Sequence, residues 1–273
     1  MSTLVSCPEI EALTTRSKSI WMAGDYDHFS RYMESDARAF YERLKPSPGS
    51  RFLDVSCGSG QLAMLAARDG LAVTGVDIAT NLIEQARMHA RAEALPVRFE
   101  EADAAALPFE DASFDVVASL IGAMFAPRPN CVAKELLRVC RPGGTIAMAN
   151  WSPQGVVGKM FKLIWKTISP PGTPSPLLWG DETTVRKRFG AGFSHLSLNK
   201  RYYTFNYPFP PSEVVEFYRL YYGPTNRAFA SLDAIGREKL RQDLEELCSS
   251  YNRARAGRTT FFAEYLEVVG IRA

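Results

Sequence analysis

The fold of this chain is decided by one segment, Phe52-Leu53-Asp54-Val55-Ser56-Cys57-Gly58-Ser59-Gly60. Its apolar first half predicts a short buried strand. Gly58 and Gly60 predict a tight loop that a ligand can approach closely, because glycine has no Cβ atom. A helix rich in alanine and leucine is expected over 61–68, with its free N–H groups facing the same point. The segment is therefore expected to form a ligand-binding strand, loop and helix.

The same alternation of strands and helices continues from 51 to 151. Strands are expected at 51–55, 72–76, 97–100, 114–119 and 145–150, with helices at 61–68, 80–94 and 130–139. This rhythm is typical of a doubly wound parallel α/β sheet covered on both faces. Ligands of such sheets bind at the carboxyl ends of the strands.

The parts outside this alternation have patterns of their own. Aromatic residues at helical spacing predict a helical cover over 20–45, whereas the residues before it carry little pattern. Late strands are expected at 197–207 and 259–272, and two helices within 208–256 form a predicted cap between them. We expect a single domain over 1–273, with its ligand-binding core at 50–151.

Composition excludes several classes of protein. The net charge is +2 and basic residues are dispersed, which argues against a nucleic-acid-binding surface. No apolar run reaches the roughly 20 residues of a membrane helix, and we find no signal peptide pattern. The 5 cysteines form no C-x-x-C pair. They predict free thiols in a reducing, cytoplasmic location, with neither disulfides nor a metal site.

Acidic residues follow three neighbouring expected strands. Asp77 can accept hydrogen bonds from a ribose diol, and Asp103 from an exocyclic amine. Asp54 can face an ammonium group, or it can brace the glycine loop. Three carboxylates suit an adenosine that carries a positively charged amino-acid tail, and they would repel a pyrophosphate. The sequence therefore predicts a site for a cationic adenosine.

Several motifs occur in one order along the chain: Leu53–Gly60, Val73–Asp77, Ala102–Ala104, Leu107–Phe109, Ser113–Val117 and Leu137–Gly144. This set resembles the class I S-adenosylmethionine-dependent methyltransferases, and most closely their small-molecule group, which includes ubiquinone and menaquinone biosynthesis enzymes. The resemblance implies a Rossmann-like seven-stranded sheet whose last strand is antiparallel. The one departure is Ser56, where the family usually has glycine. Serine fits there if its φ is negative.

The resemblance also implies S-adenosylmethionine as cofactor and assigns residues to it. Ser56 and Gly58 would contact the methionine part, Asp77 the ribose, and Asp103 the adenine amine. The full cofactor set is Asp54, Ser56, Cys57, Gly58, Gly60, Asp77, Ile78, Asp103, Ala104, Ser119 and Leu120. Ile78 would stack on adenine beside Ala104, and the end of the strand at 114–119 would face the methyl group.

The methyl acceptor is expected to be small or lipophilic and to bind among aromatic side chains. The expected pocket residues are Trp21, Met124, Phe125, Trp151, Tyr218, Tyr221 and Tyr222. Helical periodicity also allows the late aromatic residues to be core. In-line transfer needs mainly positioning. The candidates for a catalytic role are His28, Tyr26 and Tyr222.

Three other functions remain open at this stage. Gly58–Ala63 fits G-x-G-x-x-A, which suits an NAD-dependent oxidoreductase, although Asp54 and Asp103 would repel its pyrophosphate. Ser59 lies between glycines, but a serine hydrolase needs glycine at position 57. A non-catalytic module that binds S-adenosylmethionine is the third alternative.

Overall fold

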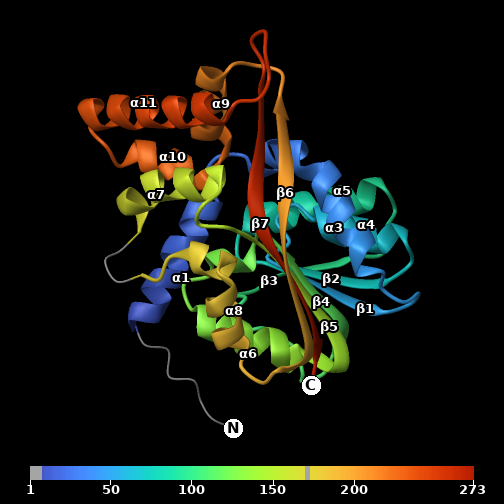
Figure 1. Cartoon of the computed structure of the whole chain (residues 1–273). Helices are drawn as coiled ribbons and strands as arrows, with labels where there is room; N and C mark the ends of the chain where they lie inside the picture. The colour runs from blue at the N-terminus through green and yellow to red at the C-terminus, as the bar shows by residue number, and fades with distance from the viewer. Residues whose placement is uncertain (1–7, 170–172) are drawn as a thin grey trace.

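A seven-stranded sheet forms the centre of the computed structural model, which describes residues 8–169 and 173–273 (Figure 1). The strand order is β3-β2-β1-β4-β5-β7-β6, and β7 runs antiparallel to both of its neighbours. This confirms the expected sheet. The strands are β1 (Arg51–Val55), β2 (Ala72–Asp77), β3 (Arg98–Glu101), β4 (Phe114–Leu120), β5 (Cys140–Trp151), β6 (Phe193–Tyr207) and β7 (Thr259–Arg272).

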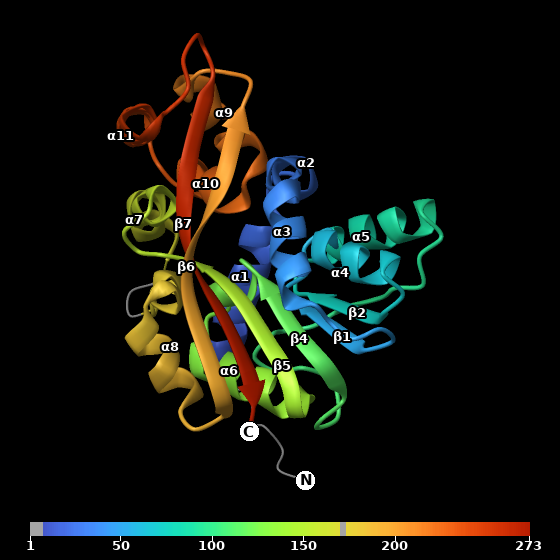
Figure 2. The same cartoon turned by 45° about the vertical axis from the view of Figure 1, so that its right-hand side comes forward.

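Helices cover both faces of this sheet. Figure 2 shows α3, α4 and α5 on one side and α6 and α8 on the other. The α-helices are α1 (Pro8–Trp21), α2 (Tyr26–Ser30), α3 (Glu34–Leu44), α4 (Gln61–Arg68), α5 (Thr80–Ala92), α6 (Pro129–Val139), α7 (Val156–Ile168), α8 (Glu182–Phe189), α9 (Pro211–Tyr221), α10 (Gly223–Ala230) and α11 (Ala234–Tyr251). Short 3₁₀ turns are η1 (Arg31–Met33), η2 (Ala123–Phe125) and η3 (Pro176–Gly180). None of the helices so described is long and apolar enough to cross a membrane.

Two helices differ from the sequence-based expectation. α1 lies in the segment that showed little pattern, because the side chains described in it are only half-buried or exposed. Between β6 and β7 there are three helices, where two were expected. α10 begins at Gly223-Pro224, and proline is tolerated in the first turn of a helix, where its missing N–H is not needed.

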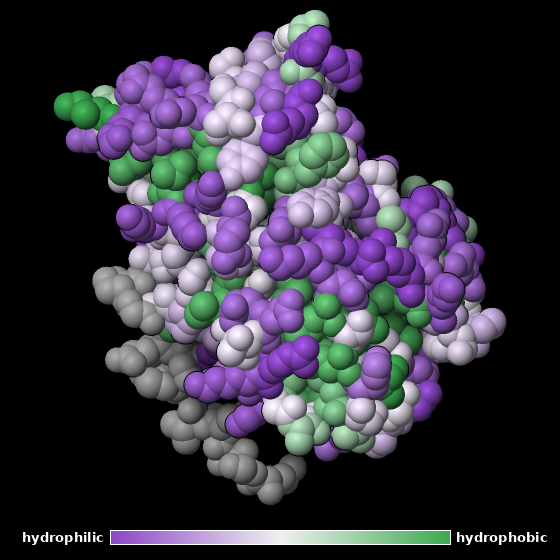
Figure 3. Space-filling model, in the orientation of Figure 1, coloured by the Kyte–Doolittle hydropathy of each residue, from purple (hydrophilic) through white to green (hydrophobic). Residues whose placement is uncertain are grey.

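β6 and β7 extend beyond the sheet as a two-stranded ribbon. Trp151, the end of β5, pairs with Tyr265, so the first part of β7 pairs with β6 alone. Tyr203, Phe205 and Tyr207 alternate along β6 onto one buried face, as expected from the sequence. α9, α10, α11 and α7 gather around this ribbon (Figure 1), and Figure 3 shows a largely hydrophilic outer surface over α11.

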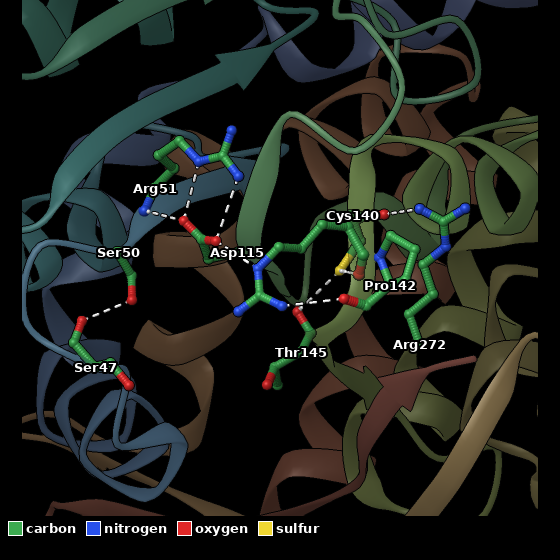
Figure 4. A network of polar contacts seen from close by, with 9 residues as sticks. Ser47, Ser50, Arg51, Asp115, Cys140, Pro142, Thr145 and Arg272 are labelled. Carbon is green, nitrogen blue, oxygen red and sulfur yellow. Dashed lines mark hydrogen bonds and ion pairs between the residues drawn. The ribbon is translucent and has the colours of Figure 1, made fainter.

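Charged side chains join neighbouring elements at two places. Asp115 near the start of β4 accepts hydrogen bonds from Arg51 at the start of β1 and from Arg141 near the start of β5, and Figure 4 shows this network. The Arg51 guanidinium holds the pKa of Asp115 well below its usual range. Elsewhere, Glu267 of β7 is buried and pairs with Arg43 of α3 at 2.8 Å and with Arg201 of β6 at 2.5 Å. Helix α3 is thereby anchored to β7 within the sheet.

The cysteines are unpaired wherever the structure describes them. Cys57, Cys131, Cys140 and Cys248 are free thiols. Cys7, which was also expected to be free, lies outside the described residues. Four of the five cysteines are therefore free thiols, as expected from the sequence. That Cys7 is also a free thiol stays a prediction.

The buried ion pair of Glu267 is expected to contribute more to stability than an exposed pair. Arg43→Met should lower the free energy of unfolding by roughly 2–3 kcal/mol, because a buried carboxylate would lose one partner. Arg219→Met is the matched control, since its pair with Glu216 lies on the exposed side of α9, and it should cost less than about 1 kcal/mol. Urea denaturation measures both, and equal losses would contradict the argument.

Candidate active site

The loop between β1 and α4 has an unusual backbone. Ser56, Gly58 and Gly60 have φ values of 59°, 56° and 91°, all in the left-handed region. From the sequence, serine was expected to fit at position 56 with a negative φ. This expectation is wrong, because the φ of Ser56 is positive. Cys57 N–H donates to the Val76 carbonyl of β2 at 2.9 Å, which turns the chain sharply directly after Ser56. For a serine this conformation costs about 1–3 kcal/mol, so the surrounding contacts must hold it.

Asp77 supplies one of these contacts. Its Oδ2 accepts a hydrogen bond from Gly58 N–H at 2.9 Å, and its Oδ1 accepts one from Ala79 N–H at 2.8 Å. The carboxylate at the end of β2 thus holds both the glycine loop and the start of α5. Burial raises the pKa of Asp77, although these N–H groups oppose the rise. Asp77 also lines the cavity described below.

Asp54 is tied to the next helix. Its Oδ2 accepts a hydrogen bond from Ala63 N–H at 3.0 Å, in the first turn of α4. The residue before that helix is Gly60, which has no side chain to cap it, so Asp54 satisfies a free N–H group in its place. Burial raises the pKa of Asp54 to about 7, and the nearby Asp77 charge adds to the rise.

Asp103 is the most open of the three acids. Its Oδ1 accepts from Ala105 N–H at 2.8 Å, and its Oδ2 pairs with Arg128 Nη2 at 2.8 Å. Arg128, which lies just before α6, was not predicted from the sequence. The ion pair holds the Asp103 carboxylate beside Ala104 at the end of β3.

All three acids line one cavity of about 890 Å³, part of which is open to solvent. It lies at the carboxyl ends of β1, β2 and β4. The expected cofactor residues that line it are Asp54, Ser56, Cys57, Gly58, Asp77, Ile78, Asp103, Ala104 and Leu120. Gly60 and Ser119 do not line it. Gly60 faces Phe99 and starts α4, and Ser119 Oγ accepts from Ala123 N–H at 2.9 Å and shapes η2.

The opposite wall of this cavity comes from the N-terminal helices. Ser17 and Trp21 of α1, Tyr26 and Ser30 of α2 and Met33 of η1 line it. Gln61 connects the two walls, because its Nε2 donates to the Ser30 carbonyl at 2.8 Å. Sequence reasoning missed Ser17, Ser30, Met33 and Gln61. The only available signal was the position of Gln61 directly after the glycine loop.

A small aromatic chamber adjoins the cavity. The residues that line both spaces are Trp21, Tyr26, Met33, Ile121 and Phe125. Of the expected acceptor residues, Trp151, Tyr218 and Tyr222 also line the chamber, and none of the described residues in its lining is charged. The Ile121 backbone has a φ of 60°, which is strained for a β-branched residue at the meeting point of the two spaces.

The remaining expected residues lie elsewhere. Met124 and Tyr221 are absent from the lining of both spaces. Met124 is buried and lines a neighbouring groove, and its sulfur accepts a hydrogen bond from Trp151 N–H at 3.4 Å. His28 also lines neither space, and its ring lies 4.5 Å from the ring of Tyr221. Burial raises the pKa values of Tyr26 and Tyr222 far above the usual range, so both hydroxyls are neutral at physiological pH.

Comparison with known proteins identifies the family. Residues 53–148 match the family model described as "Methyltransferase domain". The chain is 33% identical over 248 residues to the uncharacterized protein Rv1405c of Mycobacterium tuberculosis, covering 89% of this chain and 90% of that protein. It is 34% identical over 160 residues to demethylmenaquinone methyltransferase of Thermus thermophilus, covering 55% of this chain and 72% of that enzyme.

Solved structures share the fold. The YcgJ protein of Bacillus subtilis superposes with a TM-score of 0.59 at 18% identity, over 87% of this chain and 98% of that one. Phosphoethanolamine N-methyltransferase 2 of Haemonchus contortus, solved in complex with S-adenosyl-L-methionine, gives a TM-score of 0.57 at 20% identity, over 87% of this chain and 52% of that one.

These findings agree with the motifs read from the sequence. The chain belongs to the class I S-adenosylmethionine-dependent methyltransferases, and S-adenosylmethionine is its cofactor. The family membership decides against the oxidoreductase and hydrolase alternatives.

The raised pKa of Asp54 predicts a pH-dependent stability. An unfolded aspartate titrates near ~3.9, so the folded state holds the proton more tightly, and stability falls as the pH rises from about 4 to about 7. Asp54→Asn removes this titration while keeping an acceptor for Ala63 N–H. The variant should therefore gain stability relative to wild type between pH 5 and pH 8, as measured by urea denaturation.

Asp115→Asn is the control for this experiment, because the pKa of Asp115 is shifted downward. Its carboxylate is ionised in both the folded and the unfolded state above about pH 5, so its difference from wild type should stay constant over the same range. The same pH dependence in both variants would refute the assignment to Asp54.

Proposed function

We propose that this enzyme transfers the methyl group of S-adenosylmethionine to a small or lipophilic, uncharged acceptor. The observation that carries the proposal is the pairing of an acid-lined cavity with an aromatic chamber that lacks charged side chains. Burying an unpaired charge in such a chamber would cost far more than burying an apolar group. The chamber therefore favours an acceptor that enters without a charge.

The cofactor would lie along the acid-lined cavity. Gly58 and Ser56 would contact its methionine part, and Asp77, whose carboxylate also accepts from Gly58 and Ala79, would accept from its ribose hydroxyls. Ile78 would stack on the adenine, and Asp103 would accept from the adenine amine. The buried carboxylates of Asp54 and Asp77 repel each other, which suits a cationic ligand and opposes a pyrophosphate.

The chain's own residues would act mainly by positioning. When bound, the cofactor supplies an electrophilic sulfonium methyl group. Trp21, Tyr26 and Phe125 line both spaces and would orient the acceptor toward it. Well-oriented reactants gain about 7–11 kcal/mol over free ones. Aromatic faces add about 0.5–2 kcal/mol for a nearby cation.

A general base is not needed in this proposal. Burial raises the pKa of Tyr26 and of Tyr222, so neither hydroxyl accepts a proton readily, but each can donate a hydrogen bond to the acceptor. His28 lines neither space and is assigned a packing role against Tyr221. The acceptor would therefore bring an atom that is already nucleophilic.

The remaining assignments follow from the same picture. We infer a small-molecule acceptor with no nucleic-acid partner, because the net charge of +2 includes 32 basic and 30 acidic residues. Free thiols support a reducing, cytoplasmic location. The segment 20–45 is assigned as a cover over the core at 50–151, and 208–256 as the cap.

The role of Asp77 can be tested by calorimetry. Asp77→Ala should weaken S-adenosylmethionine binding by roughly 1–3 kcal/mol, because hydrogen-bonding partners would be left unpaired. Asp181→Ala is a matched control, since Asp181 caps α8 through Thr184 N–H and does not line the cavity. Its affinity should equal that of wild type. An unchanged affinity in Asp77→Ala would sink the assignment.

Turnover separates an enzyme from a non-catalytic binding module. Uncharged arylamines and their charged, carboxylate-bearing analogues should be incubated with S-adenosylmethionine, and S-adenosylhomocysteine should be measured by mass spectrometry. A neutral amine nitrogen attacks through its lone pair, and the methylated ammonium then loses its proton to water, so no base in the protein is required. We expect product with the uncharged set alone. Binding of S-adenosylmethionine without any turnover across the set would favour the binding module, and a preference for the carboxylates would contradict the chamber's assignment.

A further inference from the structure

A second apolar space leads away from the cavity. It is a shallow groove, open to solvent, between α1, α7 and the chain just before η3. Leu13 and Ile20 line it from α1, Trp165 and Ile168 from α7, and Pro176 from η3. None of these five residues lines the cofactor cavity or the aromatic chamber. The groove is therefore not explained by the proposed cofactor site or by the proposed site of the reacting group.

The groove adjoins the cofactor cavity, and the packed rings of Trp21 and Phe125 lie between the two spaces. Ser17, Trp21, Phe125, Ala126 and Pro127 line both spaces. Trp21 and Phe125 also line the aromatic chamber, so these two side chains lie where all three spaces meet. A single elongated molecule can therefore place one end at this junction and extend its other end along the groove.

The side chains that line the groove determine which kind of ligand group can bind there. Among the described residues that line it, Arg16 is the one with a charged side chain, and its Nε donates to the Ile168 carbonyl at 3.0 Å, which holds its guanidinium against the end of α7. The groove walls are otherwise mostly aliphatic, aromatic or proline side chains. Such walls stabilise a hydrocarbon chain by removing it from water and offer little to a polar group.

We propose that the groove binds a hydrocarbon tail of the methyl acceptor. The acceptor is then an amphiphile, with its reacting head at the junction of Trp21 and Phe125 and its tail between α1 and α7. This inference rests on the proposed function for the identity of the head, but the groove itself can be tested without turnover. The groove is explained by binding of the tail and does not depend on which atom of the head is methylated.

The test uses 4-alkylphenols of increasing chain length and calorimetry. Binding is measured to the wild-type chain alone and with S-adenosylhomocysteine present. Affinity should rise about fourfold for each added methylene, which corresponds to ~0.8 kcal/mol, until the groove is full. An affinity that does not change with chain length would overturn the proposal.

Blocking the groove gives the decisive comparison. Leu13→Trp should flatten the dependence on chain length while leaving the affinity for the shortest phenol and for S-adenosylhomocysteine unchanged. Leu178→Trp is the matched control, because Leu178 is 42% exposed and does not line the groove. It should keep the wild-type dependence. Leu13→Asp is a second blocking variant, since a carboxylate in the groove should repel the tail.

The outcomes separate the two proposals. A wild-type dependence on chain length in both Leu13 variants would overturn the groove's assignment, even if S-adenosylhomocysteine binds normally. Loss of S-adenosylhomocysteine binding by the wild-type chain would instead contradict the cofactor site. In that case, binding of the 4-alkylphenols to the protein without S-adenosylhomocysteine still tests whether the groove binds a hydrocarbon tail.

Discussion

The hydrogen bond from Gly58 N–H to the Asp77 carboxylate is the contact on which the site depends. It joins the loop after β1 to the end of β2, and the second oxygen of Asp77 holds the start of α5 through Ala79 N–H. One side chain therefore sets the positions of a loop and a helix. The strain of a left-handed Ser56 is tolerated because this contact, together with the bond from Cys57 N–H to Val76, leaves the loop little freedom.

The site also concentrates uncompensated negative charge. Asp54 and Asp77 are both buried, and neither has a basic side chain as hydrogen-bond partner among the contacts described, whereas Asp103 is paired with Arg128. Burial without a cation raises the pKa of both buried carboxyls. A cationic ligand would relieve this cost. The aromatic chamber beside the cavity has the opposite character, since none of its described lining residues is charged. In the proposed function, this contrast separates the methyl donor from the acceptor.

Much of the core could be predicted because its signals are local. Alternating apolar strands, the glycine loop and the acids at strand ends all lie within short segments, and strand-end residues of a parallel sheet necessarily meet at one edge. The geometry of Ser56 could not be predicted this way. Its φ depends on Val76 and on the approach of Gly122, whose added Cβ would lie 2.4 Å from the Ser56 carbonyl oxygen. Arg128 was missed for the same reason, since its partner Asp103 is 25 residues away.

The sequence by itself determined the class of fold, the order of its elements and the type of cofactor, because periodicity and strand-end acids are local properties of the chain. The tertiary structure alone decided which of the proposed acceptor residues lie together. Trp21, Phe125 and Trp151 come from distant segments, and only packing of α1 against the sheet and cap brings them to one chamber. The half-buried α1 carries too weak a pattern to reveal that it covers the site, and so the groove beside it became visible only once the chain was folded.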